Sequence, residues 1–413
     1  MQSSIQKICS AVKAASMELA NYTTEQKNKI LECVAQELIK NSQKILDTNK
    51  LDLEAASNKP SHYLDRLRLT QDRIMSMAQG VKDVINLPDP IGEVLDEYEN
   101  SNKLKIVKVR VPLGVIGIIY EARPNVTVDV AALCIKSGNA VILRGSRDAV
   151  SSNTALVEVM KDAIKRAGFN PDIVGYVDCD HEQAVELMKA NEYIDVLVPR
   201  GSDKLIKTVV QNSTIPVIET GTGNCHVYIH SSADLDMAVN VTVNAKVSRP
   251  SVCNAAESLL IDEQIYKEYL PKICQALAEH NVKIKGCPKT CAVFPAAESA
   301  SEDDYYAEFL DYIISVKVVK DYNEAIDHIN RYGTKHSEAI ITQDEEVAKE
   351  FTKRVDAAAV YVNASTRFTD GGVFGFGAEL GISTQKLHAR GPMGLKELTS
   401  YKYVIYGNGQ VRK

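Results

Sequence analysis

One cysteine of the chain lies in a setting suited to nucleophilic chemistry. Cys253 is part of the segment SRPSVCNAAESLL, residues 248–260, with polar residues around it and an apolar run after it. A nearby cation such as Arg249, together with free backbone N–H groups, lowers the pKa of a thiol and favours the reactive thiolate. Most buried cysteines are structural, however. From these residues alone, Cys253 is either a nucleophile or a small core residue.

The other cysteines give weaker candidates. Cys225 lies beside His226, but neighbouring residues of a strand point to opposite faces, which separates this pair. Cys134 lies in an apolar helical pattern and is expected in the core. Cys287 and Cys291 have half of a zinc-site spacing without a second pair, so we expect no metal.

Two further residues follow predicted strands. Asn125, in YEARPNVTVD (120–129), comes after a buried strand, where its side-chain N–H can stabilise an oxyanion. Glu219 ends the run IPVIE and can act as a base. Each also has an ordinary explanation, because asparagine and proline often end strands in turns and a carboxylate can cap a turn.

Two strand-to-helix turns indicate anion binding. Glycine and serine at a helix start leave backbone N–H groups available for a phosphate; the alternative is an ordinary turn with solvated arginines. We predict a dinucleotide cofactor here, although the GxGxxG fingerprint is missing. The residues are Arg144, Gly145, Ser146 and Arg147 after one strand, and Arg200, Gly201 and Ser202 after the other. Arg144 and Arg147 can also meet a 2′-phosphate, which favours NADP over NAD.

Alternating strand and helix patterns must position these residues. The first hundred residues are predicted to be helical, with a capping box at Thr23 and Gln26. From Val115 onward, short apolar runs alternate with helical stripes, which predicts a doubly wound parallel sheet that includes IPVIE as a strand. A second α/β unit is expected after Asn224. The half-polar segments LKIVKVRVP and TSYKYVIYG are predicted strands, the first of them an edge strand or hairpin arm.

Composition narrows the class of function. With 413 residues, 45% hydrophobic and 25% charged, the chain has an ordinary globular balance. At about 150 residues per domain, it should form a few domains. A net charge of −6 gives no reason to expect nucleic acid or an anionic membrane as a partner. The N-terminus has no apolar signal region, and the odd number of cysteines suits a reducing compartment, so we expect a cytoplasmic protein.

The order of these residues resembles that of the aldehyde dehydrogenase superfamily. A PLGVIGI strand leads to Asn125, and the turn at 144–147 stands where the superfamily has Lys-Pro-Ser. A Gly-Ser turn at 201–202, a Glu-led glycine turn at 219–223 and the Cys253 loop follow. Glu308 and Phe309 resemble the segment that holds the nicotinamide ribose. The resemblance runs from about Pro112 to Val404 and makes Cys253 the expected nucleophile.

Longer stretches are similar to one branch of that superfamily, which reduces γ-glutamyl phosphate to glutamate 5-semialdehyde with NADPH in the second step of proline biosynthesis. They include VPLGVIGIIYEARPNVTVDVAALCIKSGNAVILRGS and FTDGGVFGFGAELGISTQKLHARGPMGL. The resemblance implies a thioester on Cys253 and an oxyanion held by Asn125. It places Glu219 in the base position, although a reductase, which must avoid water, does not need that base. Arginines suit the phosphate and carboxylate of the substrate; the candidates are Arg123, Arg249 and Arg367.

The resemblance also implies an architecture: an α/β fold with two doubly wound domains and a small β oligomerisation element. Residues 1–100 and 112–224 are expected to form the NADP-binding domain, 225–380 the catalytic domain, and 101–111 with 398–413 the oligomerisation strands. We expect a homodimer or homotetramer whose substrate is supplied by glutamate 5-kinase. The alternatives are a hydrolytic or CoA-acylating aldehyde dehydrogenase and, in a different class, a non-catalytic binding protein on a dehydrogenase scaffold.

Overall fold

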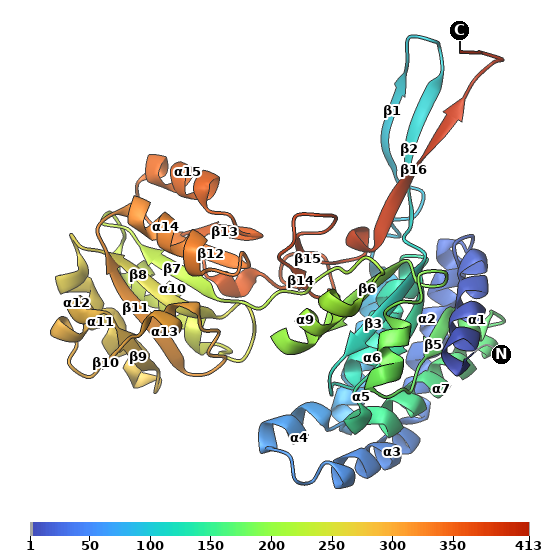
Figure 1. The fold of residues 1–413 in the computed structure, drawn as a ribbon, viewed down its shortest axis with the longest axis horizontal. Helices are drawn as coiled ribbons and strands as arrows, with labels where there is room; N and C mark the ends of the chain where they lie inside the picture. Colours follow the sequence, from blue (N-terminus) through green and yellow to red (C-terminus); the bar gives the residue numbers. More distant parts are fainter. Residues whose placement is uncertain (1–2, 413) are drawn as a thin grey trace. The chain divides into compact units, whose positions relative to one another are not determined.

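The computed structural model describes residues 3–412, and the chain divides into two units (Figure 1). Unit 1 comprises the chain up to Glu219, residues Gly375–Gly381 and the chain from Met393. Unit 2 comprises residues Thr220–Phe374 and Ile382–Pro392. The first boundary lies slightly before the position expected from the sequence, and each unit has an α/β architecture of its own.

Unit 1 begins with helices, as the sequence predicts. They are α1 (Ser4–Leu19), α2 (Thr24–Lys40), α3 (Ser42–Ala55), α4 (Ser61–Leu67) and α5 (Gln71–Asn86). The predicted capping box starts α2, with Thr23 N donating to Gln26 Oε1 at 2.8 Å and Gln26 N donating to Thr23 Oγ1 at 3.3 Å. The two residues thereby satisfy N–H groups that the first helical turn leaves unpaired.

A four-stranded parallel sheet forms the centre of unit 1, in the order β5-β4-β3-β6. All residues of β3 and β4 are buried, as expected for parallel strands covered on both faces. In chain order, the first strand of this sheet is β3. The next strands, β4 and β5, lie on one side of β3, and β6 lies on the other side. The topological switch point therefore lies between β3 and β6. The elements are β3 (Val115–Tyr120), α6 (Asn125–Lys136), β4 (Ala140–Arg144), α7 (Val150–Arg166), β5 (Val174–Tyr176), α8 (His181–Leu187), β6 (Val196–Arg200) and α9 (Asp203–Asn212).

The predicted strand IPVIE is wrong as a full strand. It is reduced to a single parallel bridge between Val217 and Leu197, supported by Ile218 N donating to Leu197 O at 2.9 Å. Pro216 has no N–H to give to a ladder, which limits pairing in this segment.

A second sheet of unit 1 is antiparallel, in the order β1-β2-β16. Its strands are β1 (Val94–Glu99), β2 (Lys105–Pro112) and β16 (Thr399–Tyr406), which lie side by side in Figure 1. The expectation of an edge strand is wrong, because β2 pairs with both β1 and β16 and is the central strand. The hairpin alternative is correct. β1 was not predicted, because all its residues are exposed and it lacks a buried apolar face.

Unit 2 is built on a seven-stranded parallel sheet, in the order β10-β9-β11-β8-β7-β12-β13. β7, β8 and β12 are entirely buried. Because successive strand residues point to opposite faces, Val227 joins a core with α10 and α11, whereas Tyr228 joins a core with α14 and α15. The strands are β7 (Cys225–Ile229), β8 (Ala256–Asp262), β9 (Lys283–Gly286), β10 (Glu298–Ser299), β11 (Ile313–Val319), β12 (Ser337–Ile341) and β13 (Ala359–Val362). The helices are α10 (Leu235–Val247), α11 (Tyr266–Glu279), α12 (Pro288–Val293), α13 (Glu302–Tyr306), α14 (Tyr322–Tyr332) and α15 (Glu345–Arg354). The short strands β14 (Ile382–Ser383) and β15 (Gly391–Pro392) pair with each other.

Candidate active site

Cys253 lies in the turn that joins α10 to β8, at the amino end of β8. Its residue is partly buried, and its backbone is held from two sides. Cys225 Sγ donates to the Cys253 carbonyl oxygen at 3.2 Å. A Cβ added to Gly223 would lie 1.4 Å from that same oxygen, so only glycine fits there. The turn therefore has a fixed backbone and a thiol that is not fully enclosed.

A loop after β13 holds the other side of this turn. Asn254 Nδ2 donates to Thr369 O at 2.9 Å, and Thr366 Oγ1 donates to Asn254 O at 2.7 Å. Arg367, in the same loop, donates through Nη1 to Asn254 Oδ1 and through Nε to Ser248 Oγ at 2.9 Å. The guanidinium of Arg367 is thereby fixed beside the turn that carries Cys253.

Two of the predicted substrate arginines lie together near the thiol. Burial, and then the positive charge of Arg249, lowers the pKa of Arg367, while the charge of Cys253 acts in the opposite direction. Arg249 is exposed, whereas Arg367 is partly buried. The structure thus brings Cys253, Arg249 and Arg367 together in one unit, as a binding site for anions next to a thiolate requires.

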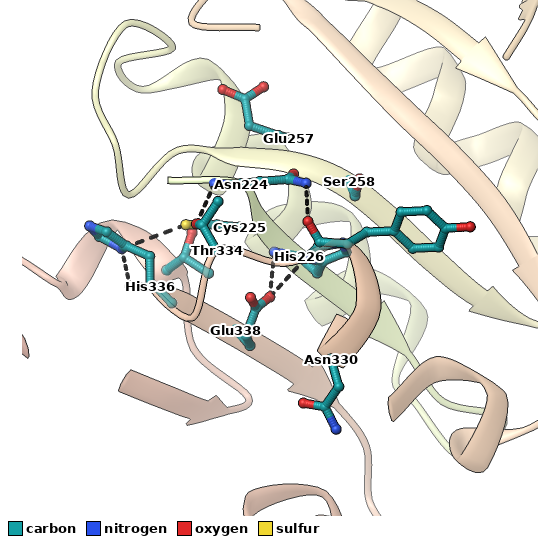
Figure 2. A network of polar contacts seen from close by, with 12 residues as sticks. Asn224, Cys225, His226, Glu257, Ser258, Asn330, Thr334, His336 and Glu338 are labelled. Atoms are coloured by element: carbon teal, nitrogen blue, oxygen red, sulfur yellow. Dashed lines mark hydrogen bonds and ion pairs between the residues drawn. The ribbon is translucent and has the colours of Figure 1, made fainter. Parts of the chain in front are cut away.

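Cys225 contacts this turn, and its side chain is directed at His336 (Figure 2). It is fully buried, and burial raises its pKa well above the ordinary value for a thiol. Its sulfur lies 3.7 Å from His336 Nδ1, whereas His226 Nδ1 lies 3.0 Å from Glu338 Oε2. The expectation that Cys225 and His226 point in different directions is confirmed, and Cys225 supports the Cys253 backbone.

Glu308 is connected to the same turn through Gly223. Its Oε1 accepts a hydrogen bond from Gly223 N at 2.6 Å, and Gly223 in turn packs on the backbone of Cys253. The segment expected to hold the nicotinamide ribose and the turn expected to hold the nucleophile are therefore neighbours within unit 2.

The switch point of unit 1 gathers a second group of predicted residues. Asn125 is the first residue of α6, and its Nδ2 donates to Asp129 Oδ2 at 3.0 Å. Burial raises the pKa of Asp129 to about 6, against the opposing effects of Asn125 and Arg200. Across the switch point, Ser202 Oγ donates to Glu121 Oε1 at 2.6 Å. A Cβ on Gly201 would lie 2.6 Å from Glu121 Cδ, so the glycine allows this close approach. Arg123 is exposed in the loop after β3.

The turn after β4 was expected to leave backbone N–H groups at the start of the next helix available for a phosphate, but the structure shows otherwise. The carboxylate of Asp52 accepts from Ser151 N at 3.1 Å and from Ser152 N at 2.8 Å, so the first N–H groups of α7 are already bonded. Arg144 is buried and donates through Nη2 to Cys179 O at 3.4 Å, whereas Arg147 is exposed. Sequence reasoning could not find Asp52, because it comes from α3, far away in the chain.

The remaining residues of that turn have local structural roles. A Cβ on Gly145 would lie 2.1 Å from Asn153 Nδ2, and Ser146 Oγ accepts from Asp148 N at 3.2 Å. Glu219 is partly buried and is the last residue of the first segment of unit 1. Asn125, Glu219 and the two cofactor turns thus belong to unit 1, whereas Cys253, Arg249, Arg367 and Glu308 belong to unit 2.

Two buried charged residues beside the Cys253 turn were not found from the sequence. Lys246 is in the last turn of α10 and Glu257 is the second residue of β8, and both side chains have 0% exposure. The sequence did contain a signal, because one charged residue lies within an apolar helix and the other within an apolar strand. A pattern of hydrophobicity alone does not detect such residues.

Residues 3–412 contain neither a metal-binding cluster nor a membrane-spanning helix. Within this part of the chain, no cluster of three or more His, Cys, Asp and Glu side chains is arranged to hold a metal ion. No helix among the same residues has both the length and the apolar character needed to cross a membrane.

Comparison with known proteins gives consistent matches over almost the whole chain. The model of the aldehyde dehydrogenase family matches residues 1–305 and 307–404. A γ-glutamyl phosphate reductase of Clostridium beijerinckii is 58% identical over 403 residues, covering 97% of each chain. One of Caldicellulosiruptor bescii is 55% identical over 409 residues, covering 97% of this chain and 98% of the relative. The crystal structure of the γ-glutamyl phosphate reductase of Thermotoga maritima covers 100% of both chains, with 47% identity and a TM-score of 0.98.

Proposed function

Because this chain belongs to the aldehyde dehydrogenase family, we propose that it catalyses the reaction for which its close relatives are named. It reduces γ-glutamyl phosphate to glutamate 5-semialdehyde and phosphate, a step of proline biosynthesis. The observation that carries the proposal is the Cys253 turn, where a partly buried thiol on a fixed backbone lies near two arginines. An acyl phosphate needs both a nucleophile and cations for its leaving group.

The chain performs the reaction through a covalent intermediate. The Cys253 thiolate attacks the carbonyl carbon of the acyl phosphate, the C–O bond to phosphate breaks, and a thioester remains on Cys253. Asn125 Nδ2 donates to the developing oxyanion, while Asp129 accepts one of its two N–H groups and orients the amide. The hydride that reduces the thioester would come from NADPH when it is bound. Collapse of the resulting thiohemiacetal releases the aldehyde and returns the Cys253 thiolate.

The two arginines of unit 2 have different tasks. Arg367 is held by Ser248 and Asn254, so it supplies a fixed positive charge. Arg249 is exposed and can close on the departing phosphate or on the α-carboxylate of the substrate, since a guanidinium matches either anion with two hydrogen bonds. Arg123 adds a further cation from unit 1.

NADPH is the proposed cofactor, and unit 1 has residues that fit it. Arg147 is an exposed cation three residues after the end of β4, and an arginine near a strand end can meet a 2′-phosphate in doubly wound sheets. Arg200, Gly201 and Ser202 lie at the switch point, where such sheets bind nucleotides. Asp52 already accepts from the N–H groups at the start of α7, so we do not assign the pyrophosphate of the cofactor to that helix. Glu308 binds the nicotinamide ribose.

Glu219 is not required for the forward reaction. A base at its position would activate water, and hydrolysis of the thioester would waste the substrate. In the reverse direction phosphate releases the acyl group and needs less activation than water does. Glu219→Gln should therefore retain most of the phosphate-dependent activity.

The enzyme acts in the cytoplasm on substrate supplied by glutamate 5-kinase, and it assembles as a homodimer or homotetramer through β1, β2 and β16. The decisive experiment mixes the purified protein with glutamate 5-semialdehyde and NADP, with and without inorganic phosphate, and follows NADPH formation. The proposal requires activity that depends on phosphate. Equal activity without phosphate, with glutamate as product, would identify a hydrolytic enzyme; dependence on coenzyme A would identify an acylating one.

A further inference from the structure

A fully buried ion pair spans the two ends of the Cys253 turn. Lys246 Nζ lies 2.6 Å from Glu257 Oε2, and both side chains have 0% exposure. Lys246 is in the last turn of α10, and Glu257 is the second residue of β8. The pair therefore connects the residue segments directly before and after the turn that carries Cys253.

The second oxygen of Glu257 binds a different segment. Glu257 Oε1 accepts a hydrogen bond from Leu310 N at 3.2 Å. Leu310 has φ +53°, in the left-handed region that residues other than glycine rarely adopt. The strained turn is thus held by a carboxylate, and it comes two residues after Glu308.

These contacts form a continuous chain of interactions. Glu257 holds Leu310. Glu308, two residues earlier, accepts from Gly223 N at 2.6 Å, and Gly223 packs against the backbone of Cys253. All of these residues belong to unit 2. Figure 2 shows Glu257, at the start of β8, near Asn224 and Cys225.

We infer that Glu257, neutralised by Lys246, is a positioning residue that sets the segment carrying Glu308 relative to the Cys253 turn. Its fully buried carboxylate contacts Lys246 and Leu310, so it acts through the segment that it holds. Its task is to keep the turn at Leu310 in the one conformation that presents the Glu308 carboxylate to its ligand. This inference rests on the proposed role of Glu308 in binding NADPH.

Stability alone is a poor explanation for this pair. A buried ion pair costs desolvation of both charges, and apolar residues of similar size often replace such a pair without loss of stability. Burial raises the pKa of Glu257 to about 7 and lowers that of Lys246, so the buried environment disfavours the charged form of both residues. An apolar residue in place of Glu257, however, could not accept the hydrogen bond from Leu310 N.

Two double variants separate the acceptor from the charges. K246M/E257Q removes both charges but keeps a side-chain oxygen for Leu310 N, whereas K246M/E257L removes the charges and the acceptor. We expect K246M/E257L to raise the KM for NADPH about tenfold relative to K246M/E257Q, with the KM for glutamate 5-semialdehyde changed by less than about threefold. A merely structural role would move both constants together. Hydrogen exchange of residues 307–311 should be faster in K246M/E257L only.

A rescue experiment tests the route through Leu310. Glycine adopts positive φ without strain, so adding L310G to K246M/E257L should restore part of the NADPH affinity. The inference is overturned if the two double variants show the same exchange at 307–311 and the same NADPH KM. If K246M/E257L does not fold, K246M/E257Q compared with wild type decides, because it retains the acceptor and leaves no unpaired buried charge: a tenfold or larger rise in its NADPH KM would contradict the inference.

The Glu308→Ala variant distinguishes failure of this inference from failure of the proposed function. An unchanged NADPH KM in Glu308→Ala would refute the cofactor role of Glu308. The exchange difference at 307–311 does not depend on that role and still reports whether Glu257 positions the segment.

Discussion

At the scale of single residues, Cys253 and Cys225 differ in burial and in role: Cys253 is partly buried, whereas Cys225 is buried and donates a hydrogen bond to the Cys253 backbone. Cys253→Ala should lower phosphate-dependent turnover by about four orders of magnitude or more, because no other thiol is placed in the turn. Cys225→Ala removes one hydrogen bond to the Cys253 carbonyl, so we expect it to retain at least about a tenth of the activity. Steady-state kinetics of both variants check this. Near-wild-type turnover in Cys253→Ala would show that Cys253 is not the nucleophile.

We propose that specificity for a 2′-phosphate depends on Arg147 rather than on Arg144. Arg147 is exposed, whereas Arg144 is buried against the carbonyl of Cys179. Arg147→Ala should therefore raise the KM for NADPH about tenfold and leave that for NADH nearly unchanged. Arg144→Ala serves as a comparison and should lower thermal stability as well. Equal effects of Arg147→Ala on the two cofactors would contradict the assignment.

Asp129 gives a pH dependence whose sign follows from its environment. Burial raises its pKa from 3.8 to about 6, so the folded protein binds a proton more tightly than the unfolded chain does. The contribution of Asp129 to stability therefore falls as the pH rises between these two values, and it is at its lowest above the folded pKa. We expect wild type to lose stability relative to Asp129→Asn across this interval. Thermal unfolding of both proteins at several pH values measures the difference; parallel curves would show that Asp129 does not titrate in this way.

At the scale of elements, the Cys253 turn depends on a close approach of two backbones. Gly223→Ala would place a Cβ 1.4 Å from the Cys253 carbonyl oxygen, and the displaced turn should lower kcat by about a hundredfold. Gly80→Ala, in α5, meets no atom within 4 Å and is the matched control, expected to be neutral or slightly stabilising. Circular dichroism and kinetics check both variants. An active Gly223→Ala enzyme would show that the turn tolerates displacement.

The elements that could be predicted from the sequence are those with a single clear signal. The apolar runs of β3, β4 and β8 indicated buried parallel strands, and Thr23 with Gln26 indicated the start of α2. β1 is exposed throughout and has no such signal. Pairing across large sequence separations was also invisible: Asp52 at the start of α7 and Glu257 with Leu310 are contacts that only the folded chain brings together.

The location of the site was predictable for one unit and not for the other. In unit 1 the candidate residues lie after strands, at the carboxyl edge where doubly wound sheets bind ligands. In unit 2 Cys253 precedes β8 and lies at the amino end of that strand. A rule based on strand ends would miss it, and the resemblance of the residue order was what identified it.

At the scale of the whole molecule, the sheet of β1, β2 and β16 is the proposed oligomer interface. Tyr401, Tyr403 and Ile405 alternate along β16 and are 49%, 52% and 58% exposed. Such an apolar row on an edge strand is costly in water and suits a protein partner. The double variant Tyr403→Lys and Ile405→Lys should dissociate the oligomer in sedimentation velocity, whereas Met17→Lys, on α1 and 66% exposed, should not. An unchanged sedimentation coefficient in the double variant would place the interface elsewhere.

The pairing of β2 with β16 has a consequence for biosynthesis. Thr399 pairs with Pro112 and Tyr406 with Lys105, so the outer strand leaves the ribosome only after most of the chain has been translated. Until then, the edge of β2 that pairs with β16 stays open, and the surface formed by β16 does not exist. Contacts between residues so far apart in sequence form late in folding. A nascent chain therefore cannot complete this three-stranded sheet, or present the exposed face of β16, until residues 399–406 have been translated.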